Sequence, residues 1–178
     1  MNFMQAAAGN YKKGRTGSIK YIVVHYTANN GDTAFGNAKY FRGNKNLQAS
    51  AHYFVDENEV WQSVKESDTA FHCGAKHYRH PECRNGNAIG VELCSRKSGG
   101  GKYYFKAETE DRAAELVKSL MKKYGIDTNH VLRHFDVSGK NCPAPFVEDV
   151  TKWQNFKNNL KGGGVEVEKK IKIKLNGV

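Results

Sequence analysis

The sequence has no long run of apolar residues. Nowhere in its 178 residues does a stretch approach the roughly 18 consecutive apolar residues of a transmembrane helix, so we expect no membrane contact. Residues 1–17 also lack the apolar centre of a secretory signal peptide. We therefore expect synthesis in the cytoplasm, with either export by another route or a signal that has been removed.

The sequence also has no internal repeat, and its length suits one domain with a short extension. Residues 1–160 are expected to form this domain, with a hydrophobic core large enough to fold without stabilisation by disulfides or metal ions. Residues 161–164 are mostly glycine and indicate a flexible linker. Residues 165–178 alternate apolar and charged side chains, as a half-exposed strand does, and we interpret them as the start of a truncated second domain.

Acidic residues are few relative to basic ones, which gives a formal net charge of +10. Five lysines and two glutamates in residues 161–178 account for +3, leaving +7 for residues 1–160. Such a charge favours polyanionic partners. Charge alone does not distinguish nucleic acid from an anionic cell wall. A nucleic-acid role has little other support, because the sequence has no recognisable nucleic-acid motif and no carboxylate cluster of a two-metal nuclease.

Only four cysteines are present: Cys73, Cys83, Cys94 and Cys142. An even number allows two disulfides. If Cys142 binds a metal, however, three cysteines remain and at most one pair can form. We favour free, partly buried thiols over a Cys73–Cys83 disulfide, because a reducing cytoplasm keeps thiols reduced.

The apolar pattern predicts alternating strands and helices. We expect strands over 19–27, 51–56, 60–64, 88–94 and 130–134, and helices over about 32–42, 109–124 and 146–160. Asp32 or Thr33 is expected to cap the first helix, Thr109 to cap the second, and Gly125 to end it. These elements predict an α/β fold with a central mixed β-sheet of about five to six strands flanked by helices.

Three residues far apart in the sequence form a candidate zinc-ligand set. His25 and His134 each end a predicted strand, and Cys142 lies eight residues after His134 in a turn-rich loop. Two imidazoles and one thiolate leave a fourth zinc position for water, which distinguishes a catalytic zinc from a structural one. The alternative for His25 taken alone is a core histidine that is satisfied by hydrogen bonds.

Two charged residues are candidates for catalysis. Lys140 lies two residues before Cys142, close enough to a metal held there to stabilise an oxyanion, a contribution of roughly 3–4 kcal/mol. Glu92 lies in a strand that reads as buried, where a carboxylate is costly unless it is paired or functional, and it is a candidate general base. The alternatives are a solvated lysine and a glutamate on the polar face of an edge strand.

Further polar residues are candidates for substrate contacts. His52 and Tyr53 are adjacent in a predicted strand, so they face opposite sides of the sheet and only one can face the site. His72 lies in a predicted loop, where it would either bind substrate or hold the loop.

Four ordered blocks of this sequence resemble the zinc-dependent N-acetylmuramoyl-L-alanine amidases of the type-2 family, which includes phage endolysins, bacterial autolysins and peptidoglycan recognition proteins. The blocks are residues 22–29, 50–55, 88–93 and 134–143. The resemblance extends from about Tyr21 to Trp153, which is most of the chain. It implies a mixed β-sheet flanked by helices, with one Zn²⁺ in a surface groove held by His25, His134 and Cys142.

The resemblance also implies roles for the remaining candidates. Lys140 is similar to the family's oxyanion donor, and Glu92 to the carboxylate that some branches use as a base. Other branches place a tyrosine on the second strand, at the position of His52 here, with Tyr53 beside it. His72 is similar to a histidine near the family's substrate groove.

The activity that this resemblance implies is hydrolysis of the amide bond between N-acetylmuramic acid and L-alanine in bacterial peptidoglycan. We expect a monomer, encoded by a phage or prophage, that acts on the wall after release from the cell. Anionic wall polymers are a further expected partner, and nucleic acid is not. The alternative is a non-catalytic peptidoglycan-binding module, but such members lack the cysteine, and the ligand set here is complete.

Overall fold

The computed structural model describes residues 2–161. Its strands are β1 (Asn2–Phe3), β2 (Tyr11–Lys12), β3 (Tyr21–Tyr26), β4 (Tyr53–Val55), β5 (Val60–Gln62), β6 (Thr69–Ala70), β7 (Ala88–Leu93), β8 (Arg96–Lys97), β9 (Tyr103–Tyr104) and β10 (Val131–Arg133). Its helices are α1 (Ala34–Gly43), α2 (Ala107–Tyr124), α3 (His134–Ser138), α4 (Ala144–Val147) and α5 (Val150–Lys161). The predicted linker at 161–164, apart from Lys161 at the end of α5, and the predicted strand at 165–178 lie outside the described residues.

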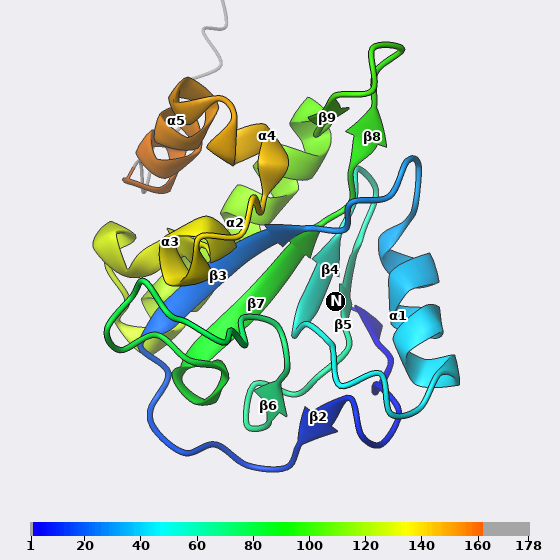
Figure 1. The fold of residues 1–178 in the computed structure, drawn as a ribbon, viewed down its shortest axis with the longest axis vertical. Coiled ribbons are helices and arrows are strands. Elements are labelled where there is room, and N and C mark those ends of the chain that lie inside the picture. The colour runs from blue at the N-terminus through cyan, green and yellow to red at the C-terminus, as the bar shows by residue number, and fades with distance from the viewer. Residues whose placement is uncertain (1, 162–178) are drawn as a thin grey trace, which may run out of the picture.

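A six-stranded sheet in the order β1-β5-β4-β7-β3-β10 forms the centre of the fold (Figure 1). The strands β4, β7, β3 and β10 run parallel, and β5 pairs antiparallel with β4 in the expected hairpin. The predicted α/β fold with a mixed sheet of five to six strands is therefore confirmed. β2 pairs with β6, and β8 with β9, in two small sheets that the sequence pattern did not predict.

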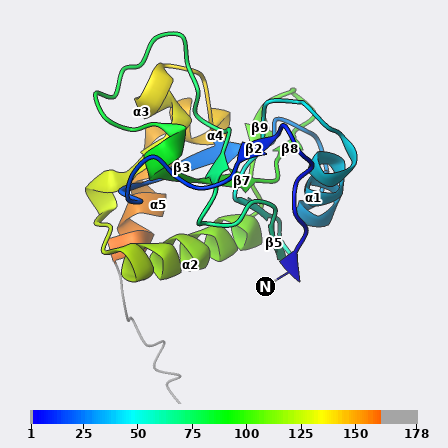
Figure 2. The same ribbon diagram turned by 90° about the horizontal axis from the view of Figure 1, so that it is seen from below.

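Helices α2, α4 and α5 cover one face of the sheet, where the main core lies (Figures 1 and 2). Alternate residues of the central strands point into this core, among them Ile22 and Val24 of β3 and Ile89 and Val91 of β7, all fully buried. The other set of alternate residues, which includes Val23 and Ala88, faces a second layer made by α3 and the segment 73–83. Helix α1 packs on this second face nearer β4. The side chains on this second face build the functional site.

Three local predictions need correction. Helix α2 begins at Ala107 after Lys106, so Thr109 is a fully buried residue of its first turn and not its cap. The predicted helix 146–160 is two helices, because the Asp149 carboxylate accepts from the Lys152 backbone N–H and so starts α5 as a new helix. His134 begins α3 and does not end a strand.

The expected helix ends are otherwise confirmed at Thr33 and Gly125. Thr33 caps α1 by accepting from the Gly36 backbone N–H at 3.0 Å. Gly125 ends α2 with φ of 65°, a left-handed conformation that suits glycine.

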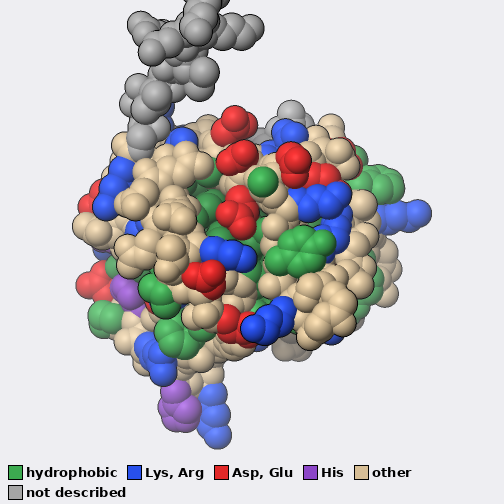
Figure 3. All heavy atoms as spheres, turned by 90° about the horizontal axis from the view of Figure 1, so that it is seen from above, with side chains coloured by type: hydrophobic (Ala, Val, Ile, Leu, Met, Phe, Trp, Pro, Cys, Tyr) green, Lys and Arg blue, Asp and Glu red, His purple; other side chains and the backbone are tan. Residues whose placement is uncertain are grey.

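No described helix is long and apolar enough to cross a membrane. On the face shown in Figure 3, basic and acidic side chains are interspersed and do not form one continuous basic area. All four cysteines are free and buried, as expected.

Candidate metal centre and active-site groove

The predicted zinc-ligand residues meet where β3 and β10 end. His25 is the second-last residue of β3, and His134 directly follows β10, which runs parallel to β3. The carboxyl ends of neighbouring parallel strands lie at one edge of a sheet, which brings these two histidines together. Their ring centres lie 4.8 Å apart.

Cys142 reaches the same place because the chain turns back after α3. Gly139 ends this helix with φ of 84°. The Phe135 backbone N–H then donates to the Cys142 carbonyl at 2.8 Å, and the Cys142 N–H donates to the Lys140 carbonyl at 2.7 Å. Cys142 Sγ lies 3.6 Å from His25 Nδ1 as a result. Helix α3 and its turn therefore supply two of the three candidate ligands.

The three side chains form the only group of three or more potential metal ligands found among residues 2–161. One ligand atom from each of His25, His134 and Cys142 lies within 4.8 Å of the others, and all three residues are buried. A tetrahedral zinc with Zn–S of about 2.3 Å and Zn–N of about 2.0–2.1 Å places sulfur about 3.6 Å from nitrogen. The observed Nδ1–Sγ distance agrees with this value, so the His25 and Cys142 donor atoms are spaced as a zinc ion needs, and His134 offers its ring nitrogen within 4.8 Å of them.

Burial sets the ionisation of these side chains. It lowers the pKa of His25 well below its usual value, with the nearby His72, His134 and Lys140 acting in the same direction. Burial, and then the charge of Lys140, lowers the pKa of His134 to about 4. Both imidazoles are therefore neutral at neutral pH, the form that binds a metal. Burial also raises the pKa of the Cys142 thiol to about 12, so metal binding must release its proton.

Glu92 lies beside the candidate ligands on the neighbouring strand. In the parallel pairing of β3 with β7, His25 is opposite Glu92, so both side chains face the same side of the sheet. Glu92 Oε2 is buried and has no hydrogen-bond partner among the described residues. Burial raises the pKa of Glu92 to about 8, while the charge of Lys140 opposes this rise. The carboxyl group is thus available to exchange a proton near neutral pH.

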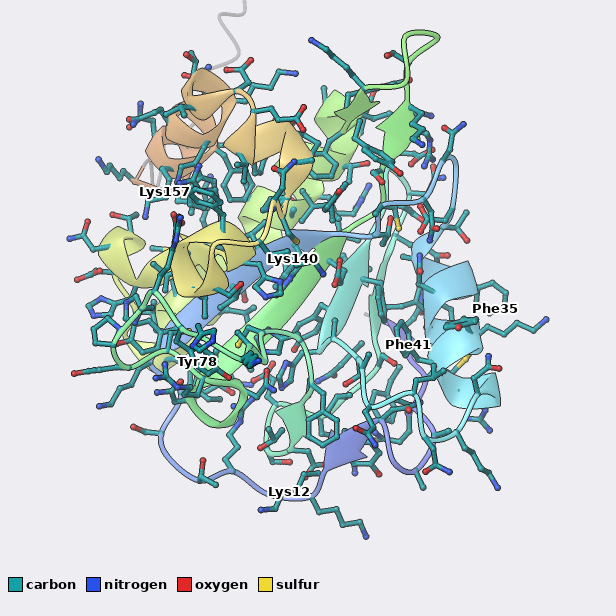
Figure 4. The ribbon with its side chains drawn as sticks, in the orientation of Figure 1. Lys12, Phe35, Phe41, Tyr78, Lys140 and Lys157 are labelled. Carbon is teal, nitrogen blue, oxygen red and sulfur yellow. The ribbon has the colours of Figure 1, made fainter. Side chains whose placement is uncertain are left out.

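Lys140 is exposed and lies near the carboxyl ends of β3 and β7 (Figure 4). Its charge acts on the pKa values of Glu92, His134 and Cys142. The structure therefore brings together all five residues that the sequence predicted for the metal and the catalytic step.

A groove of about 760 Å³ opens beside these residues. It is lined by His25, Tyr26, Thr27, Ala28, Asn29, Asp32, Gly36, Asn37, Tyr40, Phe41, Ala49, Ser50, Phe54, Phe71, His72, Glu92, His134, Lys140 and Cys142. One wall of the groove is formed by α1 and the loop before it, a segment that the sequence analysis did not include in the site. Asp32 organises this wall, because its carboxylate accepts from the side chains of Asn37 at 2.6 Å and Asn29 at 3.1 Å. The sequence signal that could have identified this side of the groove is the cluster of asparagines and Asp32 in residues 29–37.

The three predicted substrate contacts are placed differently. His72 lines the groove, but it is buried. His52 is fully buried behind it, and its Nδ1 accepts from the Gly90 backbone N–H at 3.0 Å. Tyr53 faces the opposite side of the sheet, where its hydroxyl donates to Glu66, so it points away from the groove. Neither His52 nor Tyr53 lines the groove.

Comparison with known proteins gives one consistent result. A family model described as N-acetylmuramoyl-L-alanine amidase matches residues 15–145. The chain is 39% identical over 150 residues to N-acetylmuramoyl-L-alanine amidase CwlL of Bacillus licheniformis, covering 80% of this chain and 41% of that protein. It thus spans about two-fifths of the length of this relative.

Solved structures agree with this match. The catalytic domain of XlyA superposes with a TM-score of 0.72 at 29% identity, covering 90% of this chain and 99% of that one. A mutant endolysin from Bacillus subtilis gives a TM-score of 0.70 at 29% identity, covering 90% and 99%.

Proposed function

Because the chain belongs to the N-acetylmuramoyl-L-alanine amidase family, we propose that it hydrolyses the amide bond between N-acetylmuramic acid and L-alanine in bacterial peptidoglycan, using one Zn²⁺. The observation that supports this most directly is the convergence of His25, His134 and Cys142, with Nδ1 and Sγ 3.6 Å apart as a tetrahedral zinc requires. When bound there, zinc lowers the pKa of a water molecule and polarises the substrate carbonyl.

In this proposal Glu92 is the proton carrier. Its carboxylate accepts a proton from the attacking water and then donates it to the amine of the departing L-alanine. Its support is the position opposite His25 in the sheet and the unpartnered Oε2. A general base is most effective with a pKa near the working pH, and the partly buried position of Glu92 raises its pKa into that range.

Lys140 is the proposed oxyanion donor. It is exposed at the groove and close enough to Glu92 and His134 to act on their pKa values. A preorganised cation at the developing negative charge stabilises the transition state more than the ground state.

We further propose that the protein acts as a monomer on the wall after release from a phage- or prophage-carrying cell, with no membrane contact. The likeness to a Bacillus subtilis endolysin supports the proposed action on the cell wall. The net charge of +10 suits association with anionic wall polymers, although the face in Figure 3 mixes charges of both signs.

The test is digestion of purified peptidoglycan by the full chain. We expect new amino termini, and mass spectrometry should find glycan and stem peptide separated at the lactyl amide. Chelation should stop the release and zinc should restore it. Binding to the wall without release of amino termini would instead identify a non-catalytic binding module.

A further inference from the structure

A buried histidine that the proposed mechanism does not use contacts a candidate metal ligand. His72 Nδ1 lies 3.1 Å from His25 Nε2, and the two rings meet edge to face with planes at 89°. His72 lies two residues after β6, in the layer that covers the sheet. Its contact with His25 joins residues 47 positions apart in the chain.

The direction of this hydrogen bond follows from the other nitrogen of His25. Nδ1 of His25 faces Cys142 Sγ and is the atom available to a metal. A neutral His25 that offers its Nδ1 lone pair must carry its proton on Nε2. This Nε2–H therefore donates to Nδ1 of His72, and His72 in turn carries its own proton on Nε2.

The surroundings of His72 hold its ring in this position. The backbone N–H of His72 donates to Asn85 Oδ1 at 3.1 Å. The ring packs against β7 at Gly90, where an added Cβ would lie 2.5 Å from the His72 ring carbon Cγ. The His52 ring contacts His72 on another side, with ring centres 5.7 Å apart. Glycine at position 90 thus makes the space that lets His72 reach His25.

A histidine in this place is not explained by packing alone. Nε2 of His72 is buried and has no well-aligned hydrogen-bond partner among residues 2–161, although the Ala88 backbone acts on this ring as a weak acceptor; an apolar side chain would need no partner at all. What the histidine gains is the acceptor Nδ1 for the His25 N–H. Metal-binding histidines usually donate their second N–H to such an acceptor, which fixes the tautomer and the ring orientation.

We propose that His72 is a positioning residue that orients His25 for metal binding and is not a substrate contact. The inference rests on the proposed zinc site. It implies that the acceptor atom at the Nδ1 position determines zinc affinity more than the size or shape of the side chain does.

The test compares zinc affinities of full-length variants by competition with a chromophoric chelator. His72→Leu removes the acceptor, and we expect zinc binding to weaken about 10–100-fold. His72→Asn places an amide oxygen near the former Nδ1, and we expect it to recover most of the lost affinity. His77→Ala, at an exposed histidine in the same segment, should bind zinc like the original chain.

Absorption spectra of the Co²⁺-loaded proteins give a second readout. We expect the bands of His72→Leu to shift because its His25 ring is no longer held, whereas those of His72→Asn should match the original chain. Thermal unfolding of the metal-free proteins shows whether each variant folds.

Three results would overturn the inference. His72→Leu could bind zinc as tightly as the original chain, or His72→Leu and His72→Asn could lose affinity equally although both fold. An increase in the KM of His72→Leu for peptidoglycan, with zinc affinity unchanged, would show that His72 contacts substrate. Failure of the proposed function looks different: the original chain would bind zinc, with the expected order among the variants, yet release no amino termini from the wall.

Discussion

Replacing Glu92 by glutamine should stabilise the zinc-free protein, and the gain should increase with pH. Burial raises the pKa of Glu92 from 4.5 to about 8. A carboxyl group whose pKa is higher in the folded protein does not reduce folding stability below pH 4.5, its pKa in the unfolded chain, because it is protonated there in both states. As the pH rises from 4.5 to 8, unfolding releases a proton and the folded state loses stability.

The size of the effect follows from the same values. At about 1.4 kcal/mol for each pKa unit, the rise to about 8 corresponds to a penalty of at most about 5 kcal/mol above pH 8. The Glu92 side chain is only partly covered, so water reduces this penalty and the measured value should fall below the limit. Glutamine has nearly the same shape and no charge, so it removes the penalty and should also abolish wall hydrolysis.

The assay is urea unfolding of zinc-free protein at pH 5 and pH 8.5. We expect the free energies of unfolding of the two proteins to differ by less than about 1 kcal/mol at pH 5, and Glu92→Gln to be several kcal/mol more stable at pH 8.5. Glu115→Gln, an exposed substitution on α2, is the matched control and should give the same small change at both pH values. A difference between Glu92→Gln and the original chain that does not vary with pH would refute the reasoning.

Four further predictions concern the same site. Cys142→Ser should weaken zinc binding at least 100-fold in a chelator competition, because it removes the thiolate; unchanged affinity would contradict the ligand set. Lys140→Met should lower kcat about 10²–10³-fold while zinc affinity stays constant, and equal loss of both would indicate a structural role. Gly90→Ala should destabilise the protein by about 1–3 kcal/mol in urea unfolding, because the new methyl group overlaps the His72 ring. Chelation should lower Tm, and added zinc should raise it with zinc concentration, because the ion binds the folded state; a Tm independent of zinc would count against the site.

The strands that carry the site could be predicted because their apolar runs are nearly continuous. Residues 19–27 and 88–94 gave β3 and β7, and these runs placed His25 and Glu92 correctly on strands. The sequence could not show that the two strands are neighbours in parallel register. That register decides whether His25 and Glu92 face each other, and it depends on contacts between distant segments.

Other features depended on tertiary contacts that leave little local signal. The face of Tyr53 could not be chosen from sequence, since the rule of alternation says only that His52 and Tyr53 differ. The role of α1 as a groove wall depends on how that helix packs on β4 and β5. The hydrogen bond between His72 and His25 joins a loop to a strand, and only the folded chain shows it.

The parallel pairing of β3 with β7 has a consequence for how such proteins diversify. His25 and Glu92 are fixed by backbone hydrogen bonds of a buried sheet, whereas the α1 segment that borders the groove lies outside that sheet. Substitutions in the α1 segment can therefore reshape one side of the groove, while the sheet keeps the spacing between His25 and Glu92 constant. Grafting residues 29–37 from a relative should therefore change which ligands the groove accepts without moving His25 or Glu92.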